Sequence, residues 1–193
     1  MPGTWVVVLA GGESRRFGSD KLVTDLDGVT LLDATLASVP AGLPVIVVGP
    51  ERVVRRPVSS IREDPPGGGP AAALVAGLAA ALVAGADTVS TLPGDAPGAG
   101  AAVPVLLDAL VGTDLVVAHG DDGQVFPLQL AGTAAGARRV LEAAGPSLGA
   151  GASVRRLLAS LDPPPARVVL DPRALLDVDT PADLNRIGEV PTA

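Results

Sequence analysis

Short apolar runs alternate along the chain with segments whose apolar residues recur at helical spacing. Residues 5–8 and 43–48 are almost continuously apolar, which is typical of strands buried on both faces of a sheet. Further strands are predicted at 58–61, 87–92, 114–118, 125–130 and 167–170, and helices at 30–39, 70–86, 103–110, 133–144, 153–161 and 181–187. Such alternation predicts an α/β fold with a mostly parallel sheet and helices on both faces.

Composition narrows the class of protein. A length of 193 residues predicts a single domain spanning 1–193, with 48% hydrophobic and 18% charged residues as in a soluble globular chain. The absence of cysteine excludes disulfides and thiolate metal sites, and a net charge of −7 argues against nonspecific nucleic-acid binding. No basic, apolar leader is apparent, and the uncharged segment 70–86 is shorter than the ~20 residues of a membrane span. We therefore expect a cytoplasmic protein that binds neither membrane nor nucleic acid.

A glycine-containing loop, residues 9–21 (LAGGESRRFGSDK), follows the first predicted strand. Glycine lets the main chain approach an anion closely, and nearby arginine and lysine side chains add donors for phosphate oxygens. The loop matches neither the dinucleotide-binding fingerprint nor the P-loop pattern. On its glycines alone, the loop could equally be a mobile surface loop or a phosphate-binding loop.

Lys21 is the only lysine among the fourteen basic residues of the chain. A compact ammonium group is not interchangeable with a planar guanidinium, since it can be directed at a single point. This isolated use of lysine makes Lys21 the first candidate for a catalytic role.

Acidic residues follow two other predicted strands. Asp64 and Asp95 should share a sheet edge with the glycine loop, because ligands of parallel sheets bind at the carboxyl ends of strands. Asp95 is suited to a hard cation such as Mg²⁺, the alternative being a helix cap. The alternative to a ligand-binding role for Asp64 is a solvated side chain in a glycine-proline turn. In segment 177–184 (DVDTPADL), helix capping explains most polar residues but leaves Asp177 or Asp179 unassigned.

Four segments together resemble the MobA-like nucleotidyltransferase family, in the family's order. Residues 9–21 are similar to the signature L-A-G-G-x-S-x-R-M-G-x-D-K, with Phe17 in place of methionine. Asp64 with segment 66–70 resembles E-D-x-x-P-G-x-G-P-L-A-G-I, although Ala73 replaces its last glycine. Residues 93–97 resemble P-C-D-x-P with Gly94 replacing cysteine, and 177–184 resemble the closing D-[VI]-[ND]-T-P-E-D-L. The resemblance covers residues 6–184.

This resemblance implies a Rossmann-like, nucleotidyltransferase-type fold and an Mg²⁺-dependent guanylyltransferase of the molybdenum cofactor. Such an enzyme transfers GMP from GTP to the terminal phosphate of molybdopterin and releases pyrophosphate. Lys21 and Arg16 would then be catalytic, and Asp95 and Asp179 would hold the metal. The expected nucleotide-binding residues are Leu9, Ala10, Gly11, Gly12, Lys21, Asp64 and Asp95.

Several alternatives share these segments. A cytidylyltransferase of the same cofactor has a similar loop but usually carries serines where this chain has Gly69-Pro70, which favours GTP. Sugar-phosphate nucleotidyltransferases usually have longer chains and a different loop after the first strand. A nucleotide-binding partner without catalysis would not need Lys21, Asp95 and Asp179. Transient contacts with other proteins of molybdenum cofactor biosynthesis would accompany the guanylyltransferase activity.

Overall fold

A seven-stranded sheet forms the centre of the computed structural model, which describes residues 3–11, 20–26, 28–147 and 149–178. Its strand order is β5-β4-β1-β6-β8-β7-β9. The strands are β1 (Thr4–Leu9), β4 (Val45–Val48), β5 (Ser59–Ile61), β6 (Thr88–Pro93), β7 (Leu115–His119), β8 (Val125–Thr133) and β9 (Ala166–Val169). A separate hairpin pairs β2 (Asp25–Leu26) with β3 (Val29–Thr30).

The sheet is mostly parallel, as predicted. β1 runs parallel to β4 and β6, β4 to β5, and β7 to β9, whereas β8 is antiparallel to both β6 and β7. A tight turn joins β7 to β8, with Gly120 N donating to Gln124 O at 2.9 Å and Gly123 at φ +81°. Two strands joined by so short a turn must be antiparallel.

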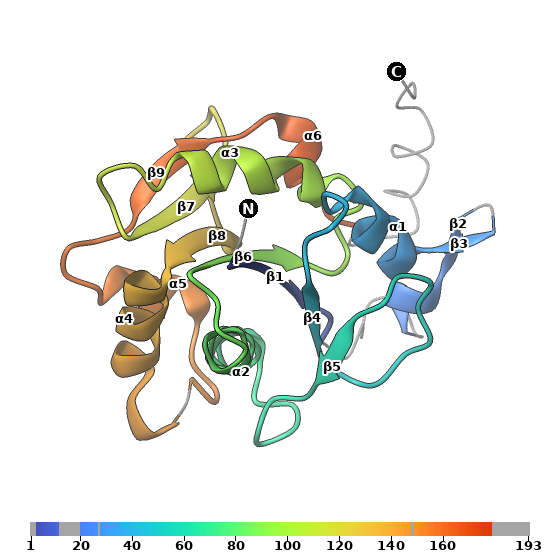
Figure 1. Ribbon diagram of the computed structural model, residues 1–193, viewed down its shortest axis with the longest axis horizontal. Coiled ribbons are helices and arrows are strands. Elements are labelled where there is room, and N and C mark those ends of the chain that lie inside the picture. The colour runs from blue at the N-terminus through green and yellow to red at the C-terminus, as the bar shows by residue number, and fades with distance from the viewer. Residues whose placement is uncertain (1–2, 12–19, 27, 148, 179–193) are drawn as a thin grey trace.

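Helices cover both faces of this sheet (Figure 1). The helices α2 (Pro70–Val83), α4 (Ala134–Ala144) and α5 (Val154–Ala159) pack on one face, and α1 (Leu31–Ser38), α3 (Ala102–Asp108) and α6 (Pro172–Leu175) pack on the other. Short 3-10 turns occur at Lys21–Val23, Ala99–Ala101 and Gly145–Ser147. Successive residues of β1 alternate between faces, so Val7 joins the core under α2 while Val6 and Val8 join the core under α1.

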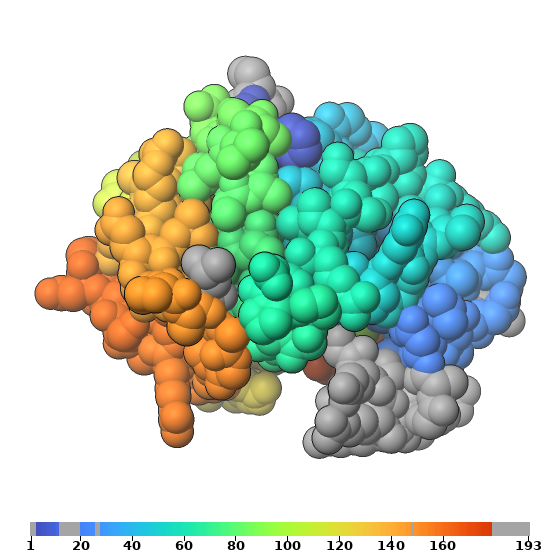
Figure 2. Space-filling model, turned by 90° about the horizontal axis from the view of Figure 1, so that it is seen from below, coloured from blue at the N-terminus to red at the C-terminus, as the bar shows by residue number. Residues whose placement is uncertain are grey.

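Helix α2 packs closely on β1 and β4 at Gly77. A Cβ at Gly77 would overlap Val7 Cγ1 and would lie 3.1 Å from Val48 Cγ2. Ala73 of the same helix is 4% exposed and belongs to the core. In the view from below, α2 lies between the α4–α5 region, coloured orange, and the β4–β5 region, coloured teal to blue (Figure 2).

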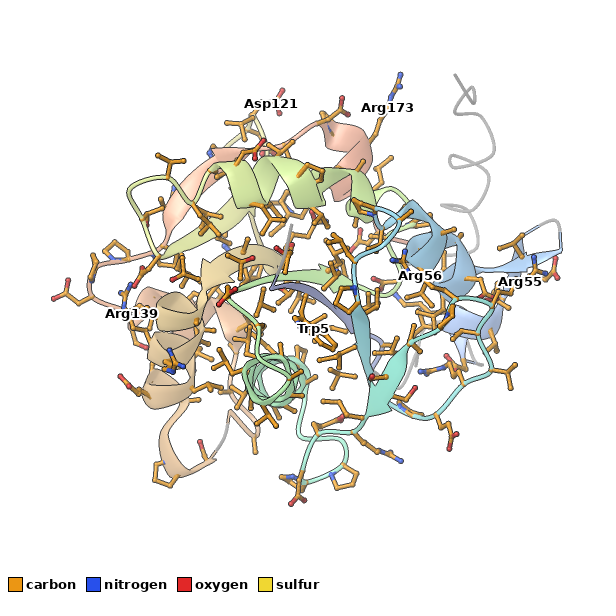
Figure 3. The ribbon with its side chains drawn as sticks, in the orientation of Figure 1. Trp5, Arg55, Arg56, Asp121, Arg139 and Arg173 are labelled. Atoms are coloured by element: carbon orange, nitrogen blue, oxygen red, sulfur yellow. The ribbon has the colours of Figure 1, made fainter. Side chains whose placement is uncertain are left out.

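The side chains of two arginines link helices to the segments beside them. Arg56 donates to four main-chain carbonyl oxygens around the end of α1, those of Leu36, Val39, Pro40 and Leu43, at 2.7–3.0 Å. Arg139 of α4 forms a 2.6 Å ion pair with Asp114, next to β7. Figure 3 shows these two arginines on opposite sides of the molecule.

The structure differs from the sequence-based elements mainly at their ends. Helix α2 ends at Val83 rather than residue 86, because Gly85 adopts φ +86° and its N–H bonds back to Leu82 O. β8 continues to Thr133 because its last residues pair with both neighbours. The β2–β3 hairpin and α6 were not anticipated, and the predicted helix 181–187 lies outside the described residues. Within the described ranges, no helix is long and apolar enough to cross a membrane.

Candidate active site at the carboxyl edge of the sheet

Three adjacent strands leave the sheet at the same edge. Leu9, at the end of β1, is paired with Val48 of β4 on one side and Pro93 of β6 on the other. Main-chain bonds continue just beyond the strands, from Ala10 N to Val48 O at 2.8 Å and from Gly94 N to Leu9 O at 2.9 Å. The glycine loop and the residues after β6 therefore begin side by side.

An ion pair between Lys21 and Asp95 lies at this edge. Lys21 Nζ is 2.6 Å from Asp95 Oδ2, and the two side chains are 16% and 20% exposed. The same ammonium group donates to Val178 O at 2.8 Å, and Val178 N donates to Asp95 O at 2.9 Å. Segments 74 residues and more apart in the sequence thus meet around one ammonium and one carboxylate that solvent can still reach.

Asp95 owes its position to β6 and α1. Thr35, buried in α1, donates its hydroxyl to Gly94 O at 3.0 Å and holds the peptide preceding Asp95. The alternative reading of Asp95 as a helix cap is wrong, because Gly98 and Ala101 occupy the cap positions of the next two helical turns. Its carboxylate faces Lys21 instead.

Gly49 lets Ala10 and Gly11, at the start of the glycine loop, lie close to the end of β4. It adopts φ +151°, and a Cβ at this position would lie 2.5 Å from Ala10 O and 2.9 Å from Gly11 N. Its own N–H donates to Ile61 O at 2.9 Å, which joins the ends of β4 and β5. A side chain here would push directly against the first residues of the loop.

The remaining sequence-predicted residues occupy different environments. Leu9 and Ala10 are 7% and 0% exposed, so only their main chains are available to a ligand, whereas Gly11 is exposed. Asp64 is exposed and lies three residues beyond β5. Gly12, Arg16 and Asp179 lie outside the described residues.

Sequence reasoning missed several residues at this edge. Glu63, not Asp64, is the buried carboxylate after β5: its Oε1 accepts from Gly67 N at 3.0 Å, and its Oε2 has no hydrogen-bond partner among the residues that the structure describes. Val178 contributes through its main chain, which no side-chain pattern reveals. Arg52 belongs to a stretch without motif or periodicity, yet it contacts both ends of the glycine loop.

Comparisons with known proteins find a matching family and similar proteins. The model of the family described as "MobA-like NTP transferase domain" matches residues 6–169. A molybdenum cofactor guanylyltransferase of Acidiphilium cryptum (strain JF-5) is 32% identical over 148 residues, covering 72% of this chain and 74% of that protein. A probable molybdenum cofactor guanylyltransferase of Opitutus terrae is 40% identical over 94 residues, and this match spans about half of that protein's length (46%) and 47% of this chain.

A solved structure extends the likeness to the fold. The crystal structure of a homologue of a Mycobacterium tuberculosis protein, from Mycobacterium sp. strain JC1, superposes with a TM-score of 0.70 at 26% identity. The match covers 95% of this chain and 94% of the mycobacterial chain. The family model matches most of the chain, residues 6–169, and the chain belongs to the MobA-like NTP transferase family.

Proposed function

We propose that this protein transfers GMP from GTP to the terminal phosphate of molybdopterin and releases pyrophosphate. The Lys21–Asp95 pair at the carboxyl edge of the sheet carries the proposal, because it offers a cationic and an anionic group side by side where parallel sheets bind ligands. The names of the Acidiphilium and Opitutus relatives support GTP and molybdopterin as the substrates.

The nucleotide would bind along the glycine loop. The main chains of Leu9, Ala10, Gly11 and Gly12 would approach the triphosphate, and Arg16 would neutralise its charge. The buried side chains of Leu9 and Ala10 support a main-chain role for these two residues. Asp64, exposed beyond β5, would accept hydrogen bonds from the guanine base.

Mg²⁺ is the proposed cofactor, with Asp95 and Asp179 as its protein ligands. The described residues contain no group of three or more His, Cys, Asp or Glu that could hold a metal. Mg²⁺ typically uses one or two carboxylates together with substrate phosphate oxygens and water. A cation already lies 2.6 Å from an oxygen of Asp95, in the form of the Lys21 ammonium, so this carboxylate is accessible to positive charge. Bound metal would supply charge neutralisation at the phosphates.

The chain's own residues would act by positioning and by charge. When a nucleotide binds, Lys21 would leave Asp95 for a phosphate oxygen and offset the negative charge that grows there in the transition state. Asp95 would then be available as a metal ligand. The acceptor phosphate is already ionised at neutral pH, so the reaction needs no general base. The whole chain, residues 1–193, would act as one such domain in the cytoplasm.

An assay of pyrophosphate release with molybdopterin as acceptor tests this function. GTP, CTP and ATP are compared at equal concentration with Mg²⁺, and reactions without acceptor give the background. Release that requires both GTP and molybdopterin is expected. Preference for CTP would replace the guanylyl assignment by a cytidylyl one, and no release with any nucleotide would overturn the proposal. Calorimetry with the same three nucleotides measures base preference without an acceptor.

A further inference from the structure

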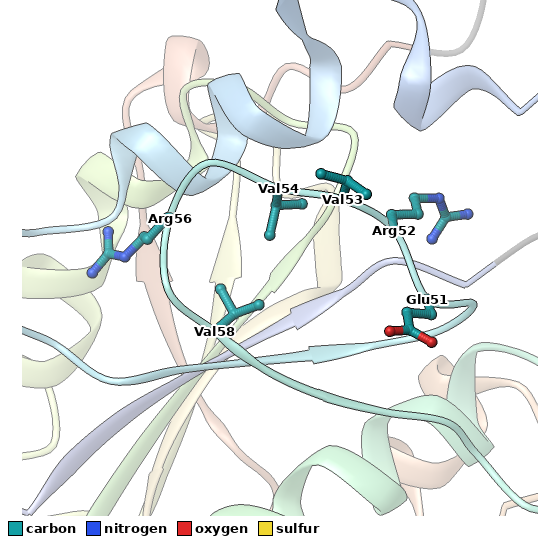
Figure 4. Close-up of a pocket in the computed structure, with 6 residues that line it drawn as sticks. All are labelled: Glu51, Arg52, Val53, Val54, Arg56 and Val58. Carbon is teal, nitrogen blue, oxygen red and sulfur yellow. The ribbon is translucent and has the colours of Figure 1, made fainter.

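Arg52 lies in the connection between β4 and β5 and reaches the glycine loop from outside it. Its side chain is 7% exposed. Arg52 Nε lies 2.7 Å from Asp20 Oδ2, and Nη1 donates to Ala10 O at 2.8 Å and to Pro50 O at 3.2 Å. Arg52 and Arg56 of the same connection point in opposite directions (Figure 4).

Two of the three acceptors of this guanidinium, Ala10 O and Asp20 Oδ2, lie at the two ends of the glycine loop. Ala10 is the residue at which β1 passes into the loop, and Asp20 immediately precedes Lys21. Asp20 also caps the 3-10 turn Lys21–Val23, since its Oδ1 accepts from Leu22 N at 3.1 Å. Both oxygens of Asp20 are therefore used, one to start the turn that carries Lys21 and one to hold Arg52.

We propose that Arg52 is a positioning residue, which fixes the ends of the glycine loop relative to each other and thereby sets the place of the Lys21 ammonium. A planar guanidinium can donate to two acceptors in different directions at once, which a lysine ammonium at the end of a flexible stem does poorly. Reactions that depend on charge placement lose rate steeply when a group shifts by about 1 Å. The inference rests on the proposed function, because it assigns Arg52 to the nucleotide site.

Arg56 provides a matched control. It is a partly buried arginine of the same connection with four bonds to main-chain carbonyls, but these lie at the end of α1 and not at the loop. Arg56→Ala should lower the melting temperature, while GTP affinity and kcat stay within about twofold of the wild type. Substitutions at distant sites without shared partners interact by only a few tenths of a kcal/mol, which sets this limit. A general effect of losing a buried arginine would appear equally in both variants.

A double-mutant cycle with Lys21 tests the proposal. GTP dissociation constants are measured by calorimetry with Mg²⁺ for the wild type, Arg52→Ala, Lys21→Ala and the double variant, and kcat and KM are measured where turnover allows. Arg52→Ala should reduce kcat by about a hundredfold, as expected for a displaced catalytic group. The effect of Arg52→Ala on GTP affinity should largely disappear when Lys21 is already replaced by alanine. Arg52→Lys should restore little of the lost kcat.

Opposite results overturn the proposal separately from the proposed function. Full additivity in the cycle, or equal effects of Arg52→Ala and Arg56→Ala on kcat, would mean that Arg52 only stabilises the fold. GTP binding by the wild type without transfer to molybdopterin would overturn the function and leave the cycle on GTP affinity valid. No binding of GTP by the wild type would overturn both.

Discussion

Lys21 and Asp95 form an ion pair at the carboxyl edge of the sheet. Both side chains are mostly enclosed, and two further bonds to the main chain of Val178 and Asp95 fix their surroundings. A charge pair in partly buried surroundings is held more strongly than a solvated one, yet these side chains still retain contact with water. In the proposed function, this ion pair would be exchanged for contacts with a charged ligand.

Asp95→Asn tests the role of the carboxylate. The amide keeps the size of the side chain but removes the negative charge, so the variant should need a much higher Mg²⁺ concentration for half-maximal activity. A magnesium titration of pyrophosphate release measures this shift. Asp114→Asn, which alters an ion pair at β7 away from the site, is the control. An Asp95→Asn titration that coincides with the wild type would remove Asp95 from the metal site.

Gly49→Ala tests the close approach of the glycine loop to β4. The new methyl group would press on Ala10 O and Gly11 N, and alanine is strained at φ +151°. The loop should shift, and GTP affinity should fall more than stability does. Gly42→Ala is the control, because Gly42 also has a positive φ, but its added Cβ would meet nothing within 4 Å. Equal GTP affinities for Gly49→Ala and Gly42→Ala would contradict this account.

At the level of single elements, the candidate site residues lie just after the ends of parallel strands. β1 leads into the glycine loop, β6 into Asp95, and β5 into Glu63 and Asp64. The intervening helices hold these ends in place, as the bond from Thr35 of α1 to Gly94 illustrates.

For Gly77→Ala in helix α2, helix propensity alone predicts a gain in stability, whereas packing against the sheet predicts a loss. Gly77→Ala gains about 1 kcal/mol of helix propensity. The added methyl would overlap Val7 of β1, and overpacking of this kind costs about 1–3 kcal/mol. We expect a net loss of unfolding free energy in urea denaturation. A variant more stable than the wild type would mean that α2 can move away from the sheet without cost.

The sequence alone anticipated the elements with continuous apolar or helical patterns. Runs such as those in β1 and β4 have few alternatives to a buried strand, and the alanine-rich pattern of α2 is equally distinctive. The β2–β3 hairpin and α6 are only two and four residues long, too short for a period to be recognised. The antiparallel direction of β8 depends on a turn rather than on the pattern of the strand itself.

At the scale of the whole molecule, strand order decides which residues meet. The order places β1 between β4 and β6, so Ala10 and Gly11, the described start of the glycine loop, lie between the ends of β4 and β6. The sequence motifs indicated the edge at which Lys21 and Asp95 lie. They did not indicate Arg52 or Val178, because the contacts of both depend on long-range packing and on main-chain atoms.

Transfer of label from GTP is the most direct test of the central claim, that Lys21 and Asp95 lie at the centre of a nucleotidyl transfer. GTP labelled at its α-phosphorus is incubated with molybdopterin and Mg²⁺, and label in the pterin product is measured for the wild type, Lys21→Ala and the control Arg56→Ala. We predict labelled product for the wild type and Arg56→Ala, and a loss of orders of magnitude for Lys21→Ala with a nearly unchanged melting temperature. Undiminished transfer of label by Lys21→Ala would contradict the account.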